Sequence, residues 1–211
     1  MDVLSDDFID RNQTHQHYEV MKELGDCYPS NGDYEKAKRC YEKASTLGPD
    51  EPGPYVGLGV IAFQSGLLDD AEIAFRVACR LDPKCAEGWS GLAMVEQKRD
   101  SCEKAFDYYL KCLELNTDNL TALLGLFQTS CRMGSFGKVI HYLELYLDMH
   151  PADTSVMFTL AALYMRDEQL IKSKEILLDI RALDPQNKDA ANLLEEVEHN
   201  LEGANFAGVS V

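Results

Sequence analysis

Apolar residues recur along most of this chain at spacings of three and four, which places them on one face of an α-helix. Short polar stretches interrupt the pattern, among them NGDY at 31–34 and SGLL at 65–68. Each of these stretches separates a first helix from a second helix, and the second helix ends at a turn that usually contains proline. The pattern therefore predicts an all-α chain of antiparallel helix pairs.

The helix pairs repeat with a period of 34 residues, since the same residue types come into register five times when the sequence is shifted by that length. Proline cannot continue a helix, so its column sets the corner between units. Small columns let two helix backbones approach closely, and an aromatic column fills the space between one pair and the next. The columns are Pro49, Pro83, Pro151 and Pro185; Leu24, Leu58, Leu92, Leu126 and Leu160; Gly25, Gly59, Ala93, Phe127 and Ala161; Tyr41, Phe75, Tyr109, Leu143 and Leu177; and Ala44, Ala78, Cys112, Tyr146 and Ile180.

This register resembles the tetratricopeptide repeat family, whose units are helix pairs of 34 residues. The resemblance covers about four-fifths of the chain and implies a right-handed superhelical solenoid. Phe127, Tyr146 and Ile180 replace small residues in the last two units, so we expect altered helix crossing there and an unchanged fold. The five units are expected at 18–51, 52–85, 86–119, 120–153 and 154–187.

The two ends of the chain lie outside these units. Residues 188–202 are expected to form a capping helix with Leu194, Val197 and Leu201 facing inward, because an open array needs an end with a polar outer face. Residues 1–17 are interpreted as a loose segment or a short helix. Residues 203–211 read as an apolar tail that is either flexible or docked in an apolar groove.

The charge of the chain narrows the classes of partner. A formal net charge of −16 offers no basic surface to nucleic acid or to an anionic membrane. The acidic N-terminus lacks the apolar core of a signal peptide, and no apolar run approaches the length of a membrane-spanning helix. We expect a cytoplasmic protein whose partners are proteins or peptides, with no nucleic acid, no membrane insertion and self-association left open.

No residue pattern indicates an enzyme. The seven cysteines are scattered without a C-x-x-C pair, and CRLDPKC at 79–85 only flanks a corner between two units, with no histidine nearby. We interpret the thiols as reduced and structural. The motifs of zinc proteases, nucleophile elbows and phosphate-binding loops are missing from the sequence. The sequence therefore predicts no catalytic residue, no metal site and no cofactor.

The resemblance places candidate binding residues on the first helix of each pair, which lines the concave surface of the family's solenoid. The floor is largely apolar, which suggests a surface that binds a partner unless a neighbouring helix or the tail covers it. The expected groove residues are Val56, Val60, Phe63, Gln64, Ser90, Met94, Gln97, Lys98, Leu124, Gln128, Cys131, Arg132, Phe158, Ala162, Met165 and Arg166.

Two details refine this groove. Glycines 57, 91 and 125 recur within helices, where glycine costs up to about 1 kcal/mol relative to alanine, so a packing reason or the close approach of a bound backbone is expected. Lys98, Arg132 and Arg166 form a basic series near the ends of the first helices. They either orient an acidic group or complement the helix dipoles.

The family's carboxylate clamp for acidic chaperone tails is not expected here. Lys22 could serve as one member, but Asp26, Val56, Val60 and Ser90 stand at other clamp places. The predicted function is therefore a non-enzymatic interaction module or scaffold that binds an extended peptide or a partner helix in an apolar groove. The alternatives are a secretion-type chaperone for an apolar client segment and a self-assembling scaffold similar to magnetosome-associated proteins.

Overall fold

The computed structural model describes residues 3–207, with side chains described for residues 13–202. These residues form eleven α-helices, one short 3-10 helix and no strand. The chain divides into two compact units, unit 1 at Met1–Gly125 and unit 2 at Leu126–Val211, and each is described by itself. The elements are α1 (Val3–Cys27), η1 (Tyr28–Asn31), α2 (Tyr34–Leu47), α3 (Pro52–Gln64), α4 (Leu68–Leu81), α5 (Ala86–Lys98), α6 (Cys102–Leu115), α7 (Leu120–Met133), α8 (Gly137–Met149), α9 (Thr154–Arg166), α10 (Leu170–Leu183) and α11 (Lys188–Ala207).

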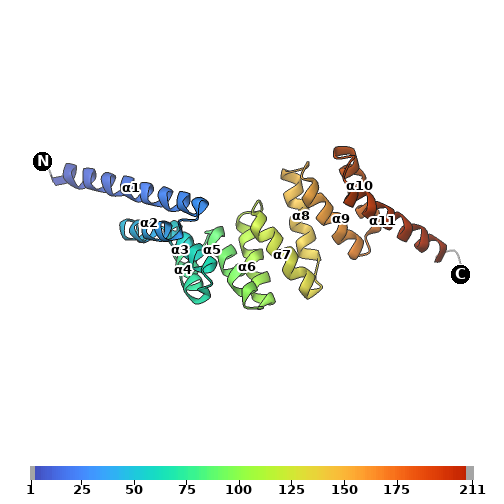
Figure 1. The fold of residues 1–211 in the computed structure, drawn as a ribbon, viewed down its shortest axis with the longest axis horizontal. Helices are drawn as coiled ribbons and strands as arrows, with labels where there is room; N and C mark the ends of the chain where they lie inside the picture. The colour runs from blue at the N-terminus through green and yellow to red at the C-terminus, as the bar shows by residue number, and fades with distance from the viewer. Residues whose placement is uncertain (1–2, 208–211) are drawn as a thin grey trace. The chain divides into compact units, whose positions relative to one another are not determined.

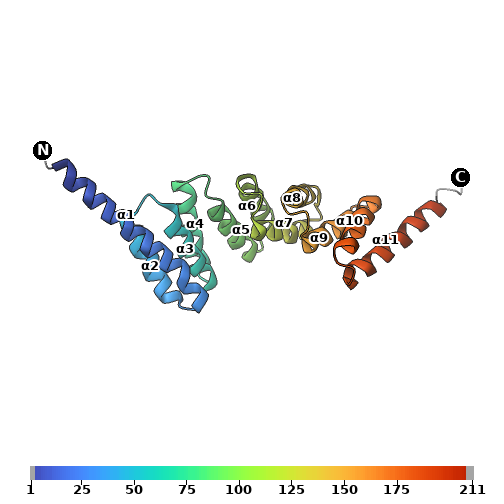
Figure 2. The ribbon, with the colours of Figure 1, turned by 90° about the horizontal axis from the view of Figure 1, so that it is seen from above.

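Consecutive helices pack on one another within each unit, as Figures 1 and 2 show. In unit 1, α1 packs on α2, α3 on α4 and α5 on α6, while α2 contacts α3 and α4 contacts α5. In unit 2, α8 packs on α9, α9 on α10 and α10 on α11. The described residues therefore confirm the predicted all-α fold of stacked helix pairs.

The turn inside each helix pair recurs with the same period of 34. One residue of each turn has a positive φ, between 60° and 77°, and backbone hydrogen bonds close the turn. At the second turn, Gly66 N–H donates to Phe63 C=O (3.0 Å) and Leu67 N–H donates to Ala62 C=O (2.9 Å). The residues with positive φ are Gly32, Gly66, Asp100, Gly134 and Glu168. The left-handed turn therefore belongs to the repeat itself, even where the residue is not glycine.

The aromatic column of unit 1 lies between small residues of two successive first helices. The ring of Phe75 sits so close to Gly59 and Gly91 that a Cβ atom would lie 2.6 Å from Phe75 Cε1 at Gly59 and 2.5 Å from Phe75 Cζ at Gly91. Tyr41 lies in the same way against Gly25 and Gly57. Since real Cβ atoms do not approach rings so closely, only glycine at these positions leaves room for the rings. The recurring glycines therefore have a packing role, and a bound backbone is not needed to explain them.

The ends of the described chain differ from the expected boundaries. Helix α1 begins at Val3, so most of the segment 1–17 is helical and continuous with the first unit. Helix α11 continues to Ala207, five residues beyond the expected end of the cap. The last four residues of the expected tail, and the side chains from residue 203 on, lie outside the described part. The inward residues of the cap are as predicted: Leu194 and Val197 are buried against α10, and Leu201 packs beside them.

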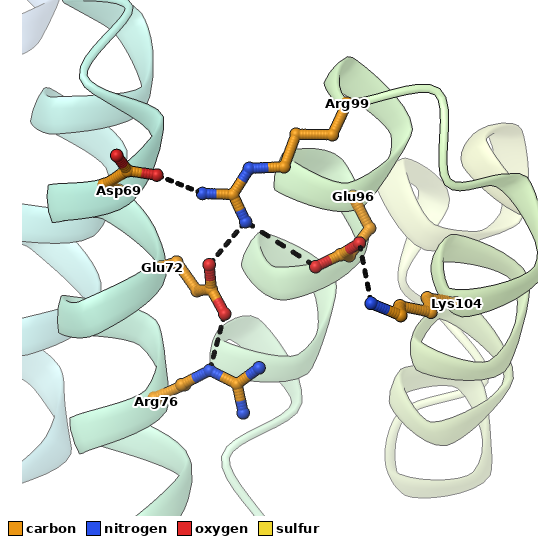
Figure 3. A network of polar contacts seen from close by, with 6 residues as sticks. All are labelled: Asp69, Glu72, Arg76, Glu96, Arg99 and Lys104. Atoms are coloured by element: carbon orange, nitrogen blue, oxygen red, sulfur yellow. Dashed lines mark hydrogen bonds and ion pairs between the residues drawn. The ribbon is translucent and has the colours of Figure 1, made fainter.

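A network of charged side chains joins α4 to α5 and α6, as Figure 3 shows. The guanidinium of Arg99, at the end of α5, donates to Asp69 (2.5 Å) and to Glu72, both on α4. Arg99 also lies 3.7 Å from the buried carboxylate of Glu96, which Lys104 of α6 approaches to 3.9 Å. Hydrogen bonds from Arg99 and then Arg76 hold the pKa of Glu72 below its ordinary value. Arg99 thus neutralises carboxylates of two successive helix pairs.

We predict that Gly91→Ala destabilises the protein by about 1–3 kcal/mol, the usual cost of overpacking a core, because the new methyl group would overlap Phe75. The matched control is Gly137→Ala, since nothing lies within 4 Å of a Cβ atom at that position. Chemical denaturation measures both variants. Adding Phe75→Leu to Gly91→Ala should cost less than the sum of the two single changes, and strict additivity would contradict the ring–glycine contact.

We also predict that Arg99→Met lowers the thermal midpoint, because Glu72 and Glu96 lose their shared cation. The lowered pKa of Glu72 contributes stability above its ordinary value of 4.5, and this contribution is lost as the pH falls through the folded-state pKa. The difference in midpoint between wild type and variant should therefore shrink as the pH falls below 4.5. Arg80→Met, which removes an exposed arginine of α4, is the control. An equal loss in both variants would argue against the network.

Candidate functional site

A cavity of about 350 Å³ opens on unit 1 between α3, α5 and the start of α7. Its floor is apolar, and polar groups stand at its margin. Val60 is 40% exposed although its neighbours on α3 pack into the core. The lining residues are Val56, Val60, Phe63, Gln64, Phe75, Glu87, Ser90, Gly91, Met94, Asn119 and Thr121.

A second cavity of about 220 Å³ adjoins the first and shares Val56, Val60 and Gln64 with it. The further lining residues come from α1, η1, α2 and α3: Asp26, Pro29, Tyr34, Tyr41, Gly57 and Ile61. Because the two cavities share three residues of α3, they form one depression that extends from α1 and α2 to the start of α7. We call this depression the groove.

The charged residues that line the groove are both acidic. Asp26 accepts hydrogen bonds from Lys22 Nζ (2.9 Å) and from the Tyr41 hydroxyl (2.7 Å). Burial, and then the bond to Asp26, raise the pKa of Tyr41 well above its ordinary value, so the phenol stays a neutral donor. Glu87 lies exposed at the other end. The groove is therefore apolar on its floor and acidic at two points of its margin.

The structure brings six of the predicted residues together at the groove: Val56, Val60, Phe63, Gln64, Ser90 and Met94. Gln97 lies beside them on α5, where its side chain accepts a hydrogen bond from the Tyr109 hydroxyl (2.6 Å). Lys98 is exposed in the last turn of α5, and Leu124 is 52% exposed on α7. These three residues belong to unit 1, like the groove itself.

The remaining predicted residues belong to unit 2. Phe158 and Met165 are partly buried against the core formed by α9, α10 and α11, as Val56 and Phe63 are against the core of α4 and α5. Arg166 lies over the ring of Phe136, with its Cζ 4.9 Å from the ring centroid. Gln128, Cys131, Arg132 and Ala162 lie on the first helices of this unit, and Arg132 is in the last turn of α7.

Sequence reasoning missed several residues of the groove. Glu87 precedes Ser90 by three positions on α5, so the helical period could have added it to the predicted row. Asn119 caps α7, its Oδ1 accepting from Ala122 N–H (2.9 Å), and its cap role gives no hint of a binding surface. Tyr41 was assigned to packing alone, whereas the second cavity also reaches its ring.

The cysteines at the corner 79–85 are free and buried. Burial is the main cause that raises the pKa of Cys79 to about 12, and it also raises the pKa of Cys85. Such thiols stay protonated and poorly nucleophilic near neutral pH. Within the described residues, no group of three or more His, Cys, Asp or Glu side chains is placed to hold a metal ion, and no helix is long and apolar enough to cross a membrane.

Known proteins share both sequence and fold with this chain. A family model described as tetratricopeptide repeat matches residues 23–85. The structure of the pilF protein of Pseudomonas aeruginosa covers 93% of this chain and 89% of that protein, with a TM-score of 0.71 and 18% identity. Residues 23–85 therefore match the tetratricopeptide repeat family, and the fold over most of the chain is that of solved tetratricopeptide-repeat proteins. The repeat period, the ring–glycine packing and the left-handed turns described above continue the same helix-pair pattern beyond the matched residues.

Two further relatives bear on these tetratricopeptide repeats. The first tetratricopeptide domain of Spaghetti (RPAP3), solved with the HSP90 peptide SRMEEVD, covers 57% of this chain and 95% of that domain, with a TM-score of 0.52 and 26% identity. Anaphase-promoting complex subunit 3 of Schizosaccharomyces pombe is 23% identical over 145 residues, which is 68% of this chain. The match spans 22% of that relative's length.

We predict that 5,5′-dithiobis(2-nitrobenzoate) modifies Cys27 first in the native protein, because Cys27 is exposed whereas Cys79, Cys85 and Cys112 are buried. Burial raises the pKa of Cys112 to about 12, so its thiolate is scarce at pH 8 as well. Absorbance titration with and without denaturant measures the effect. Cys27→Ser should remove the fast phase. A buried cysteine that reacts as fast as Cys27 would show that the corner opens in the native state.

Proposed function

We propose that this chain is a non-enzymatic protein-interaction module that binds an extended, largely apolar segment of a partner protein in the groove of unit 1. The observation that carries the proposal is an apolar depression on exposed helix faces, with Val60 at its centre. Apolar side chains that stay open to water at the bottom of a depression are typical of surfaces that bind a partner.

The size of the groove supports a segment of chain as the ligand. Its larger part, about 350 Å³, lies within the range of about 300–1,000 Å³ usual for ligand sites, and it continues into the smaller cavity. Polar groups of the lining, such as Gln64, Asn119 and Thr121, can bond to the backbone of such a segment while its side chains contact the floor. An extended peptide meets these requirements because its backbone groups are unpaired before binding.

The charge of the groove argues against an acidic ligand. The relative solved with SRMEEVD binds a peptide with three acidic residues and one basic residue. Here Lys22 is already paired with Asp26, and Glu87 adds a negative charge at the opposite margin. A bound acidic peptide would meet like charges, whose juxtaposition disfavours wrong partners. The partner segment is therefore neutral or basic, and a secretion-type chaperone for an apolar client would use the same groove.

We predict that peptides selected from a random display library against the wild-type protein are apolar and bind roughly tenfold or more weakly to Val60→Glu and to Val60→Lys. Either charge would have to be desolvated against the apolar part of the ligand. Fluorescence anisotropy with labelled peptides measures the affinities. Since Val60 is 40% exposed, both variants should keep the wild-type helicity.

Ile73→Glu is the matched control, because Ile73 is 63% exposed on α4 and does not line the groove. Selected peptides should bind this variant with wild-type affinity. If only Val60→Lys weakens binding, the contact is electrostatic and the apolar groove is not the site. Unchanged binding by both Val60 variants would place the site elsewhere on the chain.

A further inference from the structure

The first helix of every pair, and also α11, carries the same three columns along one face. The columns are Val20, Pro54, Gly88, Ala122, Val156 and Ala190; Leu24, Leu58, Leu92, Leu126, Leu160 and Leu194; and Cys27, Ile61, Val95, Thr129, Leu163 and Val197. From α3 onward, these residues are buried or, for Leu58, partly buried. Side chains of this face therefore belong to the interior of the array.

Second helices cover this face where its contacts are described. Leu92 and Val95 of α5 pack with Phe75 and Cys79 of α4. A Cβ atom at Gly88 would lie 2.8 Å from Cys79 Sγ. In unit 2, Ala190, Leu194 and Val197 of α11 pack in the same way with Leu177 and Ile180 of α10. One helix of 14 residues, such as α4 or α10, is thus enough to bury the face.

Helix α1 has the same face, and no helix among the described residues covers it. Val20 is 47% exposed, Leu24 is 38% exposed and Cys27 is exposed, whereas α2 packs elsewhere on α1. Figures 1 and 2 show α2 on one side of α1 and no described helix of unit 1 on the other. Helix α11 differs, because its exposed side carries Glu195 and Glu196. That side of α11 is polar, and the face of α1 is not.

We propose that Val20, Leu24 and Cys27, which we call the stacking face, bind one amphipathic helix of a partner protein. The helix would occupy the position on α1 that α2 occupies on α3 and α4 on α5. This proposal continues an interface that the chain already builds between its own helix pairs, so it does not depend on the groove. It also predicts which side chains the partner helix presents.

One residue of the first helix lies where the covering helix crosses it most closely, a position that we call the crossing point. The size of this residue determines which side chain the covering helix can place there. Where the first helix has Gly57 or Gly91 there, the covering helix presents the aromatic ring of Tyr41 or Phe75. In unit 2, the residue equivalent to these glycines is Thr159 on α9, and the residue equivalent to the rings is Leu143 on α8. A first helix with a larger residue at the crossing point is therefore covered by a helix with an aliphatic side chain there. Helix α1 has Glu23 at this position, and Glu23 is exposed. The partner helix should therefore present leucine or a long basic side chain, which could pair with Glu23, and not a ring.

A second copy of this chain is a poorer occupant. Each copy has a net charge of −16, and Glu19 and Glu23 flank the stacking face on α1. Two such faces would bring like charges together, which opposes association. A basic amphipathic helix meets the acidic flank with the opposite charge.

The test uses a lactam-stapled peptide with the sequence of α10, Leu170–Leu183, because this helix already covers the same columns in unit 2. The labelled peptide is titrated with the full chain, and anisotropy is recorded. Saturable binding to wild type is expected, with affinity reduced roughly tenfold or more in the double variant Val20→Glu, Leu24→Glu. Ile73→Glu and the groove variant Val60→Glu should bind as wild type does, which separates this site from the groove.

A second peptide tests the crossing point. A second stapled peptide, in which phenylalanine replaces Leu177, should bind wild type roughly tenfold more weakly than the first peptide. The variant Glu23→Gly should bind the phenylalanine peptide and the leucine peptide with equal affinity. Since Glu23 is exposed, circular dichroism should show an unchanged fold.

Three results would overturn the proposal. The first is no saturable binding of either peptide, and the second is equal binding by the double variant and wild type. The third is a concentration-dependent dimer in sedimentation velocity that the double variant abolishes, because the occupant would then be a second copy. Loss of peptide-library binding in Val60→Glu, with the stapled helix still bound, would support the groove and the stacking face separately.

Discussion

The structure depends on one steric constraint, an aromatic ring held between small residues of two successive helices. Tyr41 lies between Gly25 and Gly57, and Phe75 lies between Gly59 and Gly91. Each ring joins the two helices of its own pair and also joins that pair to the next one. The absence of a side chain on the glycines sets how closely the helices approach, and apolar burial supplies the free energy. The spacing of the first helices, and hence the width of the groove between them, follows from this contact.

The same contact links the core to the binding surface. The ring of Tyr41 packs in the interior, while its hydroxyl donates to Asp26 at the edge of the groove. The groove is lined both by residues of the packing columns, such as Tyr41 and Phe75, and by residues outside them, such as Val60 and Met94. The packing that holds the helices together thus also forms part of the groove.

Most of the fold could be predicted from the sequence, because a period of 34 with small and aromatic columns specifies which helix faces meet. The inward residues Leu194 and Val197 of α11 followed from the same period. The period placed Val56 and Phe63 in the same row as Phe158 and Met165, and all four side chains are partly buried against the cores of their own units. The period contains no information about how far neighbouring helices cover each position. Coverage depends on helix crossing, which is a property of packed side chains and not of spacing.

The uncovered face of α1 has a consequence for the order in which the protein unfolds. In a repeat array each helix pair is stabilised mainly by its nearest neighbours, so a pair with one neighbour opens at lower free energy than a pair with two. Among the described residues, α1 and α2 contact a further helix pair only at α3, whereas α4 and α5 are held from both sides and by the charges around Arg99. Amide protons of the first pair would therefore exchange by local opening, and a ligand that covers α1 would slow that exchange and make unfolding of unit 1 more cooperative.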